Sequence, residues 1–442
     1  MNTLNNFFFL PESSVLVRGA KYSLLMNFND GKTFRLNNSA SKIIELGEKG
    51  LNISEIVKSL QDETDSSDAI SFMKKLSAAG LAKISADPKP SMFGNIESIS
   101  PEFDFLWIEV TSKCNLRCIH CYADANDPRD QEMSKEDIKR VIDDAASLGW
   151  KRLQFTGGEC TLRKDLPLLI SHAKSRGFEF IEVFTNGTML TESLIKFFAE
   201  EGVSVGMSLY SYQAETHDAI TQVPGSFDKV LNSLKLLLAY GVPTRCATVA
   251  MKQNEADLIG TSYLMCKLGV FRRLPDPIRP SGRGRSMEHW PIEYGRQSIQ
   301  AQPNFEVKRE IFEKNKLWNC CWCGKAGVTS SGDVLPCLFA RDHIAGNINE
   351  QSLAEIVSGD AMQEFWSLTM DRIDTCKDCE YRYLCHDCRP WAYGISGNLY
   401  AKNPRCTYNP YNGEWGKAED ALLLNNIEHI DILTLKQGCR EC

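Results

Sequence analysis

The sequence predicts an α/β protein built on a partial (β/α)6 TIM-like barrel, with a small winged-helix-like domain before it and a cysteine-rich domain after it. Three observations lead to this prediction. Residues 104–285 alternate strand and helix patterns six times. Residues 1–88 show a hairpin pattern and then three short helical patterns. Fourteen of the 17 cysteines fall in three tight clusters.

The composition of the chain limits the classes of function that it can have. The 442 residues exceed one ordinary domain, and the net charge of −7 is spread without long blocks of one sign, which gives no argument for nucleic acid or a membrane. The N-terminus has only four consecutive apolar residues and no basic flank, so we expect a cytoplasmic protein without a signal peptide. Clustered cysteines without a secretory signal favour metal ligation over disulfides. Cys160, Cys246 and Cys266 stand alone in apolar patterns and are expected to be buried.

Residues 1–88 are predicted to form a separate domain. The stretch "YSLLMNFNDGKTFRLNN" alternates apolar and polar residues around Asp30-Gly31, which indicates a hairpin. The second of the three helical patterns opens with Asn52 and Glu55 at capping-box spacing. The stretch "ADPKPSMFGN" then reads as a linker.

The barrel is assigned to residues 104–310. Its six predicted strands are "DFLWIEVT", "RLQFTGG", "FIEVFTNG", "SVGMSLYS", "TRCATVAM" and "VFRRLPDP". Helical stretches between them, such as "SKEDIKRVIDDAASLG", fit a parallel sheet with right-handed crossovers. Six units leave the barrel open on one side, which suits a large substrate.

Two further regions follow the barrel. Residues 311–412 are rich in cysteine and loops, so we expect a fold held by metal more than by a core. Residues 413–442 are predicted to be a C-terminal helix and tail.

The first cysteine cluster, Cys114, Cys118 and Cys121, follows the first strand in a C-x-x-x-C-x-x-C pattern. This places it at the C-terminal end of the sheet, where the active-site loops of such barrels gather. Three thiolates can hold a 4Fe–4S cluster while leaving one iron open to another molecule. The alternatives are a zinc site completed by His120 or a distant residue, and a site completed by a fourth cysteine.

These residues resemble the radical S-adenosylmethionine (SAM) superfamily motif C-x-x-x-C-x-Φ-C, with His120 at the usually aromatic position Φ. The resemblance implies a 4Fe–4S cluster whose open iron binds SAM, and a 5′-deoxyadenosyl radical released on reduction. "FTGGEC" after the second strand resembles the family's GGE motif, which holds the SAM amino group. The resemblance also implies that Ser208, at the end of the fourth predicted strand, contacts the SAM ribose, and that Asn186 lies on the same rim. The implied cofactor-binding residues are His120, Gly157, Gly158, Glu159, Asn186 and Ser208.

The later cysteines resemble the SPASM extension of radical SAM enzymes, which follows C-x9–15-G-x4-C, then C-x2-C-x5-C-x3-C, then C. The resemblance implies two auxiliary 4Fe–4S clusters, hence three in all. One would take Cys376, Cys379, Cys385 and Cys406, and the other Cys337 and Cys388 with an upstream cysteine.

The sequence leaves two neighbouring cysteines as candidates for the upstream ligand of the cluster at Cys337 and Cys388. Both Cys320 and Cys321 fit the spacing to Gly332, whereas Cys323 is too near. Cys321 is preferred because its surroundings resemble a C-W-x-G-K stretch of thioether-forming members. The final pair, Cys439 and Cys442, lies outside the pattern and is expected to supply a missing ligand, bind a further cluster or form a free redox tail.

The N-terminal domain resembles the RiPP recognition element of enzymes that modify ribosomally made peptides. The resemblance implies that an extended leader peptide adds to an exposed strand edge; the alternative is a structural winged-helix-like cap. Together the resemblances imply a radical SAM maturase that installs Cys sulfur-to-carbon thioether crosslinks, as in sactipeptides and ranthipeptides. The implied partners are the precursor peptide and an electron donor such as flavodoxin or ferredoxin.

Several other functions remain open from sequence. Within the radical SAM class they are carbon–carbon or ether crosslinking and epimerisation of a peptide. Outside it, the rival is a non-catalytic iron–sulfur electron carrier, against which "FTGGEC" argues because a carrier needs no SAM cradle.

Overall fold

The structure is a computed structural model that describes residues 3–60, 65–88, 100–126, 131–272, 274–292, 294 and 305–416. The predicted C-terminal helix, Cys439 and Cys442 therefore lie outside the described residues, as does most of the predicted linker. No helix in the described ranges is long and apolar enough to cross a bilayer.

The N-terminal region contains the predicted hairpin and three helices. The hairpin is β3 (Ser23–Asn27) and β4 (Lys32–Leu36), and the helices are α1 (Asn38–Glu48), α2 (Ile53–Ser59) and α3 (Ser66–Ala78). Asn52 and Glu55 form the predicted capping box of α2. The sequence analysis missed three strands: β1 (Phe7–Phe9), which pairs antiparallel with β5 (Lys83–Ser85), and β2 (Ser14–Arg18), which pairs with β3.

The barrel prediction is confirmed. Its strands pair in parallel in chain order, and the outermost, β12, follows β10 at one edge. The strands are β6 (Phe105–Glu109), β7 (Arg152–Thr156), β8 (Phe180–Thr185), β9 (Ser204–Ser208), β10 (Thr244–Ala247) and β12 (Phe271–Arg272). Beyond this sheet, β11 (Val249–Ala250) pairs in parallel with β13 (Asp276–Pro277).

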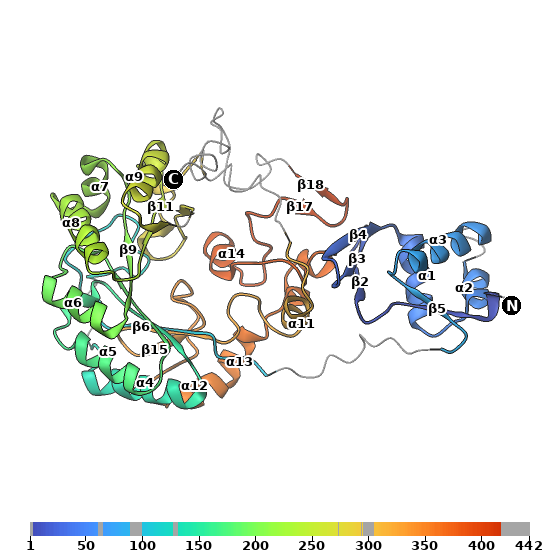
Figure 1. The fold of residues 1–442 in the computed structure, drawn as a ribbon, viewed down its shortest axis with the longest axis horizontal. Coiled ribbons are helices and arrows are strands. Elements are labelled where there is room, and N and C mark those ends of the chain that lie inside the picture. The colour runs from blue at the N-terminus through green and yellow to red at the C-terminus, as the bar shows by residue number, and fades with distance from the viewer. Residues whose placement is uncertain are drawn as a thin grey trace.

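Helices cover the outer face of the barrel sheet (Figure 1). They are α4 (Lys135–Leu148), α5 (Leu166–Ser175), α6 (Glu192–Glu201), α7 (Ala214–Thr221), α8 (Ser226–Ala239) and α9 (Leu258–Lys267). Helix α4 shows why such segments form: Ser134 and Asp137 make a capping box, and Gly149 ends the helix at a φ of 104°. Its apolar face, which includes Ile138 and Ile142, is buried against the strands.

The cysteine-rich region is joined to the barrel by a shared sheet. Strand β14 (Lys325–Val328) pairs in parallel with β6 and antiparallel with β15 (Asp333–Leu335), which pairs with β16 (Gly346–Asn347). The other elements of the region are α11 (Arg309–Leu317), α12 (Leu353–Ser358), α13 (Asp360–Trp366), α14 (Arg389–Ser396), β17 (Tyr408–Asn409) and β18 (Glu414–Trp415).

The region expected to be held by metal more than by a core does contain a substantial apolar core. Trp322, Val328 and Trp366 are each at most 1% exposed and belong to the same apolar core as the barrel. Burial of such large side chains stabilises the region independently of any cluster. Most of the cysteines of this region still lie in its loops. Strands β14 and β15 connect these loops to the barrel sheet.

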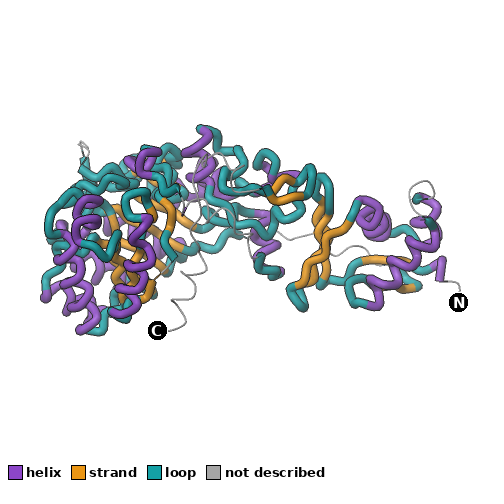
Figure 2. Tube along the Cα trace, turned by 90° about the horizontal axis from the view of Figure 1, so that it is seen from above, coloured by secondary structure: helices purple, strands orange, loops and turns teal. Residues whose placement is uncertain are grey.

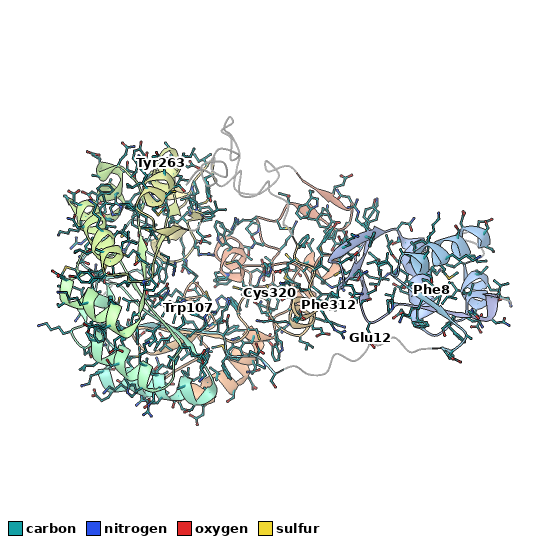
Figure 3. All side chains as sticks on the ribbon, in the orientation of Figure 1. Phe8, Glu12, Trp107, Tyr263, Phe312 and Cys320 are labelled. Atoms are coloured by element: carbon teal, nitrogen blue, oxygen red, sulfur yellow. The ribbon has the colours of Figure 1, made fainter. Side chains whose placement is uncertain are left out.

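The three regions follow one another along the molecule. The barrel and the N-terminal helices lie at opposite ends, with α11 and α14 between them (Figure 1), and the view from above shows the same elongated shape (Figure 2). Cys320 and Phe312 lie in the middle part, between Trp107 of the barrel and Phe8 of the N-terminal region (Figure 3). Val15, Val17 and Leu24 of the N-terminal sheet pack against the middle part in a cluster with Phe312 and Tyr383.

Candidate active site

The loop after β6 carries the three predicted cysteines as free thiols. Burial raises the pKa of Cys114 to about 11 and that of Cys118 to about 12, and the charges of the other cysteines of the loop act in the same direction. Buried thiols that face one another ionise only when a cation lies among them. The donor set of this loop therefore fits an iron cluster.

Side chains from outside the motif fix the shape of this loop. Asn126 accepts a hydrogen bond from the backbone N–H of Cys114 over 2.8 Å and donates to the carbonyl of Leu116 over 3.1 Å. Arg283 donates from Nε to the carbonyl of Cys118 over 2.9 Å and from its backbone N–H to the carbonyl of Cys121 over 3.0 Å. The loop is thus held in place from both sides.

The two glycines after β7 allow the next loop to lie directly against the cysteine loop. A Cβ at Gly157 would stand 2.3 Å from the carbonyl oxygen of Thr111, and one at Gly158 would stand 2.3 Å from that of Lys113. The N–H groups of Gly158 and Glu159 donate to the same two carbonyls, each over 2.8 Å. Only glycine fits this approach, which forms a cradle beside the cysteines.

Glu159 links the cradle to the end of β8. Its carboxylate is fully buried and accepts hydrogen bonds from the Thr185 hydroxyl over 2.6 Å and the Asn186 N–H over 2.7 Å. The Asn186 amide in turn donates to Asn115 Oδ1 over 2.9 Å and lies 3.8 Å from Cys114 Sγ. Through these hydrogen bonds the carboxylate holds the end of β8 against the glycine loop.

His120 and Ser208 lie on the barrel side of the cysteine loop, next to Tyr210. The His120 ring packs edge-on against Tyr210 with 4.7 Å between centroids, and Ser208 contacts the Tyr210 hydroxyl. Burial lowers the pKa of His120 to about 3, so the ring is neutral. Its Nδ1 is buried without a hydrogen-bond partner among the described residues, which leaves a polar atom for a ligand such as the adenine of SAM.

The second group of cysteines divides into two sets. Cys321, Cys337 and Cys388 influence one another electrostatically, and each also feels the charge of Arg279. Burial raises the pKa of Cys337 to about 12 and that of Cys388 to about 11. We call these three residues the three-cysteine site.

The other set is the four-cysteine site, Cys376, Cys379, Cys385 and Cys406, whose charges also act on one another. Cys320 lies beside it, since its charge acts on Cys385 and its Sγ accepts from the Asp387 N–H over 3.3 Å. Cys323 has Lys314 and Lys325 as its charged neighbours. Of the three upstream cysteines, the structure therefore brings Cys321 to Cys337 and Cys388, as the sequence analysis preferred.

Among the described residues, no group of three or more His, Cys, Asp or Glu side chains is close enough to hold a single metal ion. Of the three isolated cysteines, Cys160 and Cys246 are buried as predicted, whereas Cys266 is only partly buried.

The sequence analysis missed the arginines that contact both cysteine groups. Arg279 and Arg283 lie about 160 residues after the cysteine loop, in "RPSGRGRS" behind the last barrel strand. Gly282 has a φ of 55°, and a Cβ there would stand 2.5 Å from the Cys121 carbonyl oxygen. The glycines of this stretch are a signal in the sequence that could have indicated a close backbone contact.

Comparisons with known proteins agree with this geometry. The profile described as "Radical SAM superfamily" matches residues 108–261, and the SPASM profile, described as an iron–sulfur cluster-binding domain, matches residues 320–380. The fold is that of a radical SAM enzyme with a C-terminal SPASM domain. Its cofactors are SAM with a 4Fe–4S cluster in the barrel and auxiliary iron–sulfur clusters in the SPASM domain.

Curated relatives with quite different products resemble the chain. It is 28% identical over 335 residues to an AdoMet-dependent heme synthase of Methanosarcina barkeri, covering 68% of this chain and 95% of that enzyme. It is 27% identical over 316 residues to the subtilosin biosynthesis protein AlbA of Bacillus subtilis, covering 68% and 70%. Streptococcus suis SuiB with bound S-adenosylmethionine shares the fold, with a TM-score of 0.57 at 15% identity over 90% of this chain and 99% of SuiB.

Proposed function

We infer that this protein is a radical SAM maturase that installs Cys sulfur-to-carbon thioether crosslinks in a ribosomally made precursor peptide. The three-cysteine site carries the inference. Among the described residues, three thiols come together at this site, which would leave one iron of a 4Fe–4S cluster without a ligand from that part of the chain. A thiolate from the substrate is the natural fourth ligand, because thiolates ligate such iron.

Side chains in contact with one another lie between the three-cysteine site and the SAM loop. The Tyr122 ring, next to Cys121, packs against Phe339 with 4.9 Å between centroids. The guanidinium of Arg279 lies 4.7 Å from the centre of the Phe339 ring on the opposite side of this chain of contacts. Tyr122, Phe339 and Arg279 therefore connect the two cysteine groups.

When bound, SAM and its cluster supply a 5′-deoxyadenosyl radical, which is chemistry of the cofactor rather than of the side chains. The protein's own contribution is to hold the substrate and exclude water. The Arg279 guanidinium stabilises the ionised form of a substrate thiol, since an adjacent positive charge lowers a thiol pKa. In the net reaction a C–H and an S–H bond break and a C–S bond forms, so the peptide loses two hydrogens.

The N-terminal region is assigned to leader binding in this proposal. Its three-stranded sheet has open edges and packs directly on the cysteine-rich region. Deleting residues 1–88 is expected to weaken peptide binding without stopping uncoupled SAM cleavage. The proposed electron donor is a flavodoxin or ferredoxin, and the proposed location is the cytoplasm.

The relatives support the alternatives as well. AlbA acts in bacteriocin biosynthesis, which favours a peptide substrate, whereas the heme synthase favours a tetrapyrrole. The match to the heme synthase covers 95% of that enzyme but 68% of this chain, so part of this chain has no counterpart there. Carbon–carbon or ether crosslinking and epimerisation also remain alternatives within the peptide class.

The substrate class is tested by coupled SAM cleavage. The reduced enzyme is incubated with SAM and either a synthetic cysteine-containing peptide or an iron coproporphyrin, and 5′-deoxyadenosine is measured. We expect the peptide to stimulate deoxyadenosine release and the porphyrin to leave it at the basal rate. Stimulation by the porphyrin alone would contradict the proposal.

A further inference from the structure

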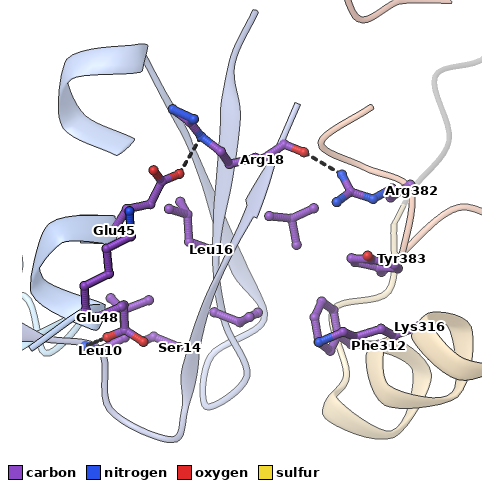
Figure 4. Close-up of a pocket in the computed structure, with 13 residues that line it drawn as sticks. Leu10, Ser14, Leu16, Arg18, Glu45, Glu48, Phe312, Lys316, Arg382 and Tyr383 are labelled. Atoms are coloured by element: carbon purple, nitrogen blue, oxygen red, sulfur yellow. Dashed lines mark hydrogen bonds and ion pairs between the residues drawn. The ribbon is translucent and has the colours of Figure 1, made fainter. Parts of the chain in front are cut away.

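A cavity of about 470 Å³ lies between the N-terminal region and the cysteine-rich region. Strand β2 and helix α1 form one wall, and Phe312, Lys316 and Tyr383 belong to the other (Figure 4). Neither the barrel site nor the cysteine sites reach it. Its volume is in the range of pockets that hold small ligands or a few peptide residues.

The cavity exposes the free edge of β2. Within the part of the chain that the structure describes, this strand pairs with β3 on one side and with no strand on the other. The hydrogen bonds from Gly19 N to Tyr22 O and from Phe28 N to Ser13 O fix which residues face β3. By the alternation of an antiparallel ladder, the backbone N–H and C=O of Leu16 point away from β3 and toward the cavity.

The edge is bounded at both ends. The Ser14 N–H donates to the Pro11 carbonyl over 2.9 Å, and the Arg18 carbonyl accepts from the Arg382 guanidinium. The groups of Leu16 between them therefore form a short stretch of open edge, long enough for one pair of strand hydrogen bonds.

A second polar group in the cavity lacks a partner. Ser14 is one of the residues that line the cavity, it is 0% exposed, and its Oγ has no hydrogen-bond partner among the described residues. A buried hydroxyl left without a partner costs about 1–3 kcal/mol. A ligand with polar backbone groups would remove this cost.

The charged side chains that line the cavity indicate which charge its ligand carries. Four cationic and two anionic side chains line it. Of the acids, Glu45 pairs with Arg18 over 2.5 Å, and Glu48 accepts the Leu10 N–H over 2.7 Å. Neither Lys49 nor Lys316 has an ion-pair partner in the described ranges. Lys49, Lys316 and Glu48 are therefore the lining groups without an ion-pair partner in the described ranges, and together they carry a net positive charge.

We propose that this cavity binds an extended, acidic segment of the precursor peptide, which adds as a strand to the β2 edge at Leu16. The segment lies between α1 and the wall formed by Phe312 and Tyr383, so that it bridges the two regions. Its acidic side chains face Lys49 and Lys316. This inference rests on the peptide substrate of the proposed function and specifies which edge of the sheet the peptide uses.

The test measures binding and hydrogen exchange on the full-length holoenzyme without reductant. The probe is a fluorescein-labelled synthetic peptide that contains cysteine and is rich in Asp and Glu, with a second peptide in which Asp and Glu are replaced by Asn and Gln. We expect K49E and K316E each to weaken binding about fivefold, as for exposed ion pairs. K58E, an exposed lysine of α2 away from the cavity, is the matched control and is expected to bind as the wild type does.

The strand edge itself is tested by L16P, with L16V as its control. Proline removes the N–H that faces the cavity, and proline is tolerated on an edge strand at such a position. We expect L16P to weaken binding at least tenfold and L16V to leave it unchanged. If L16P does not fold, amide exchange in the wild type decides, because peptide binding is expected to slow exchange at residues 14–18.

The outcomes separate the two proposals. No saturable binding of either peptide to the wild type would overturn the peptide substrate itself. Binding with protection at residues 32–36, the opposite edge of the sheet, would overturn only the cavity assignment. Equal affinity for the acidic and neutral peptides would also overturn the assignment.

Discussion

Arg279 donates a hydrogen bond from Nη1 to Cys388 Sγ over 3.3 Å, which links the end of the barrel to the three-cysteine site. The same guanidinium lies 3.7 Å from Asp276 and packs over the Phe339 ring. A fixed positive charge next to cluster thiolates stabilises the reduced state, which carries one more negative charge.

Removing this charge is expected to make the auxiliary cluster harder to reduce. We expect R279Q to lower its midpoint potential by about 60 mV, which corresponds to about 1.4 kcal/mol for one electron. R279K keeps the charge and is expected to stay within about 20 mV of the wild type. Redox titration followed by electron paramagnetic resonance measures both. Equal potentials for R279Q and the wild type would show that Arg279 does not act on the cluster.

Because Cys321 lies with Cys337 and Cys388 and Cys323 does not, we expect replacing these two cysteines to change the iron content differently. With three clusters the chain holds about 12 iron atoms, and C321A is expected to reduce this to about 8. C323A keeps about 12, since Cys323 lies among lysines rather than other cysteines. Iron and sulfide analysis of anaerobically reconstituted protein distinguishes the variants. A loss of iron in C323A with none in C321A would reverse the assignment.

The barrel cysteines are expected to be needed for SAM cleavage but not for the auxiliary clusters. Replacing Cys114, Cys118 and Cys121 together by alanine removes one set of ligands and leaves the SPASM cysteines in place. We expect no 5′-deoxyadenosine and about 8 iron atoms per chain. Continued deoxyadenosine formation would contradict the assignment of these three residues.

The glycine cradle predicts a steric effect on SAM binding. In G158A the new Cβ would meet the Lys113 carbonyl oxygen at 2.3 Å, so the cysteine loop and the β7 loop must move apart. We expect SAM affinity, measured by isothermal titration, to fall at least about tenfold, or 1.4 kcal/mol. G80A is a control for backbone strain away from the site, because Gly80 has a φ of 72° and lies in the N-terminal region, while its Cβ would meet nothing within 4 Å. Equal losses in both variants would indicate general destabilisation.

His217 predicts a pH dependence of stability. It is 1% exposed, its Nδ1 accepts the Tyr210 N–H over 3.3 Å, and burial lowers its pKa to about 4. Because the folded state binds the proton less tightly than the unfolded state, this contribution is complete above about pH 6.5 and is lost as the pH falls toward 4. The expected loss is at most about 3 kcal/mol.

The measurement compares urea midpoints of the wild type and H217N between pH 4 and 7. The asparagine amide oxygen can accept the Tyr210 N–H, and it does not titrate. We expect the difference between the two proteins to change with pH over this window. A constant difference would show that His217 does not carry the effect.

The barrel was predictable because its information is local. Each strand-and-helix unit repeats a periodicity, and motifs such as "CNLRCIHC" and "FTGGEC" sit at the strand ends that the repeat itself defines. Glu159 shows the limit of this reading. The motif located it, but its hydrogen bonds to Thr185 and Asn186 arise from the next strand in the sheet.

The contacts that could not be predicted from the sequence join segments that lie far apart along the chain. Arg279 meets Cys388 across 109 residues, and Arg341 forms a buried ion pair with Glu109 across 232 residues. Strands β1 and β5 were missed because each has three residues and gains its stability from the other, at the far end of the domain. The core of the cysteine-rich region was underestimated because β14 is short and completes its sheet with β6.

The central claim is that the substrate is a peptide whose cysteine sulfur becomes bonded to carbon. The most direct measurement is high-resolution mass spectrometry of the neighbouring precursor peptide after reaction with SAM and a reductant, followed by alkylation of free thiols. The account predicts a loss of two hydrogens per crosslink, with the crosslinked thiols no longer alkylated. Loss of two hydrogens with every thiol still alkylated, or no change in mass, would contradict it.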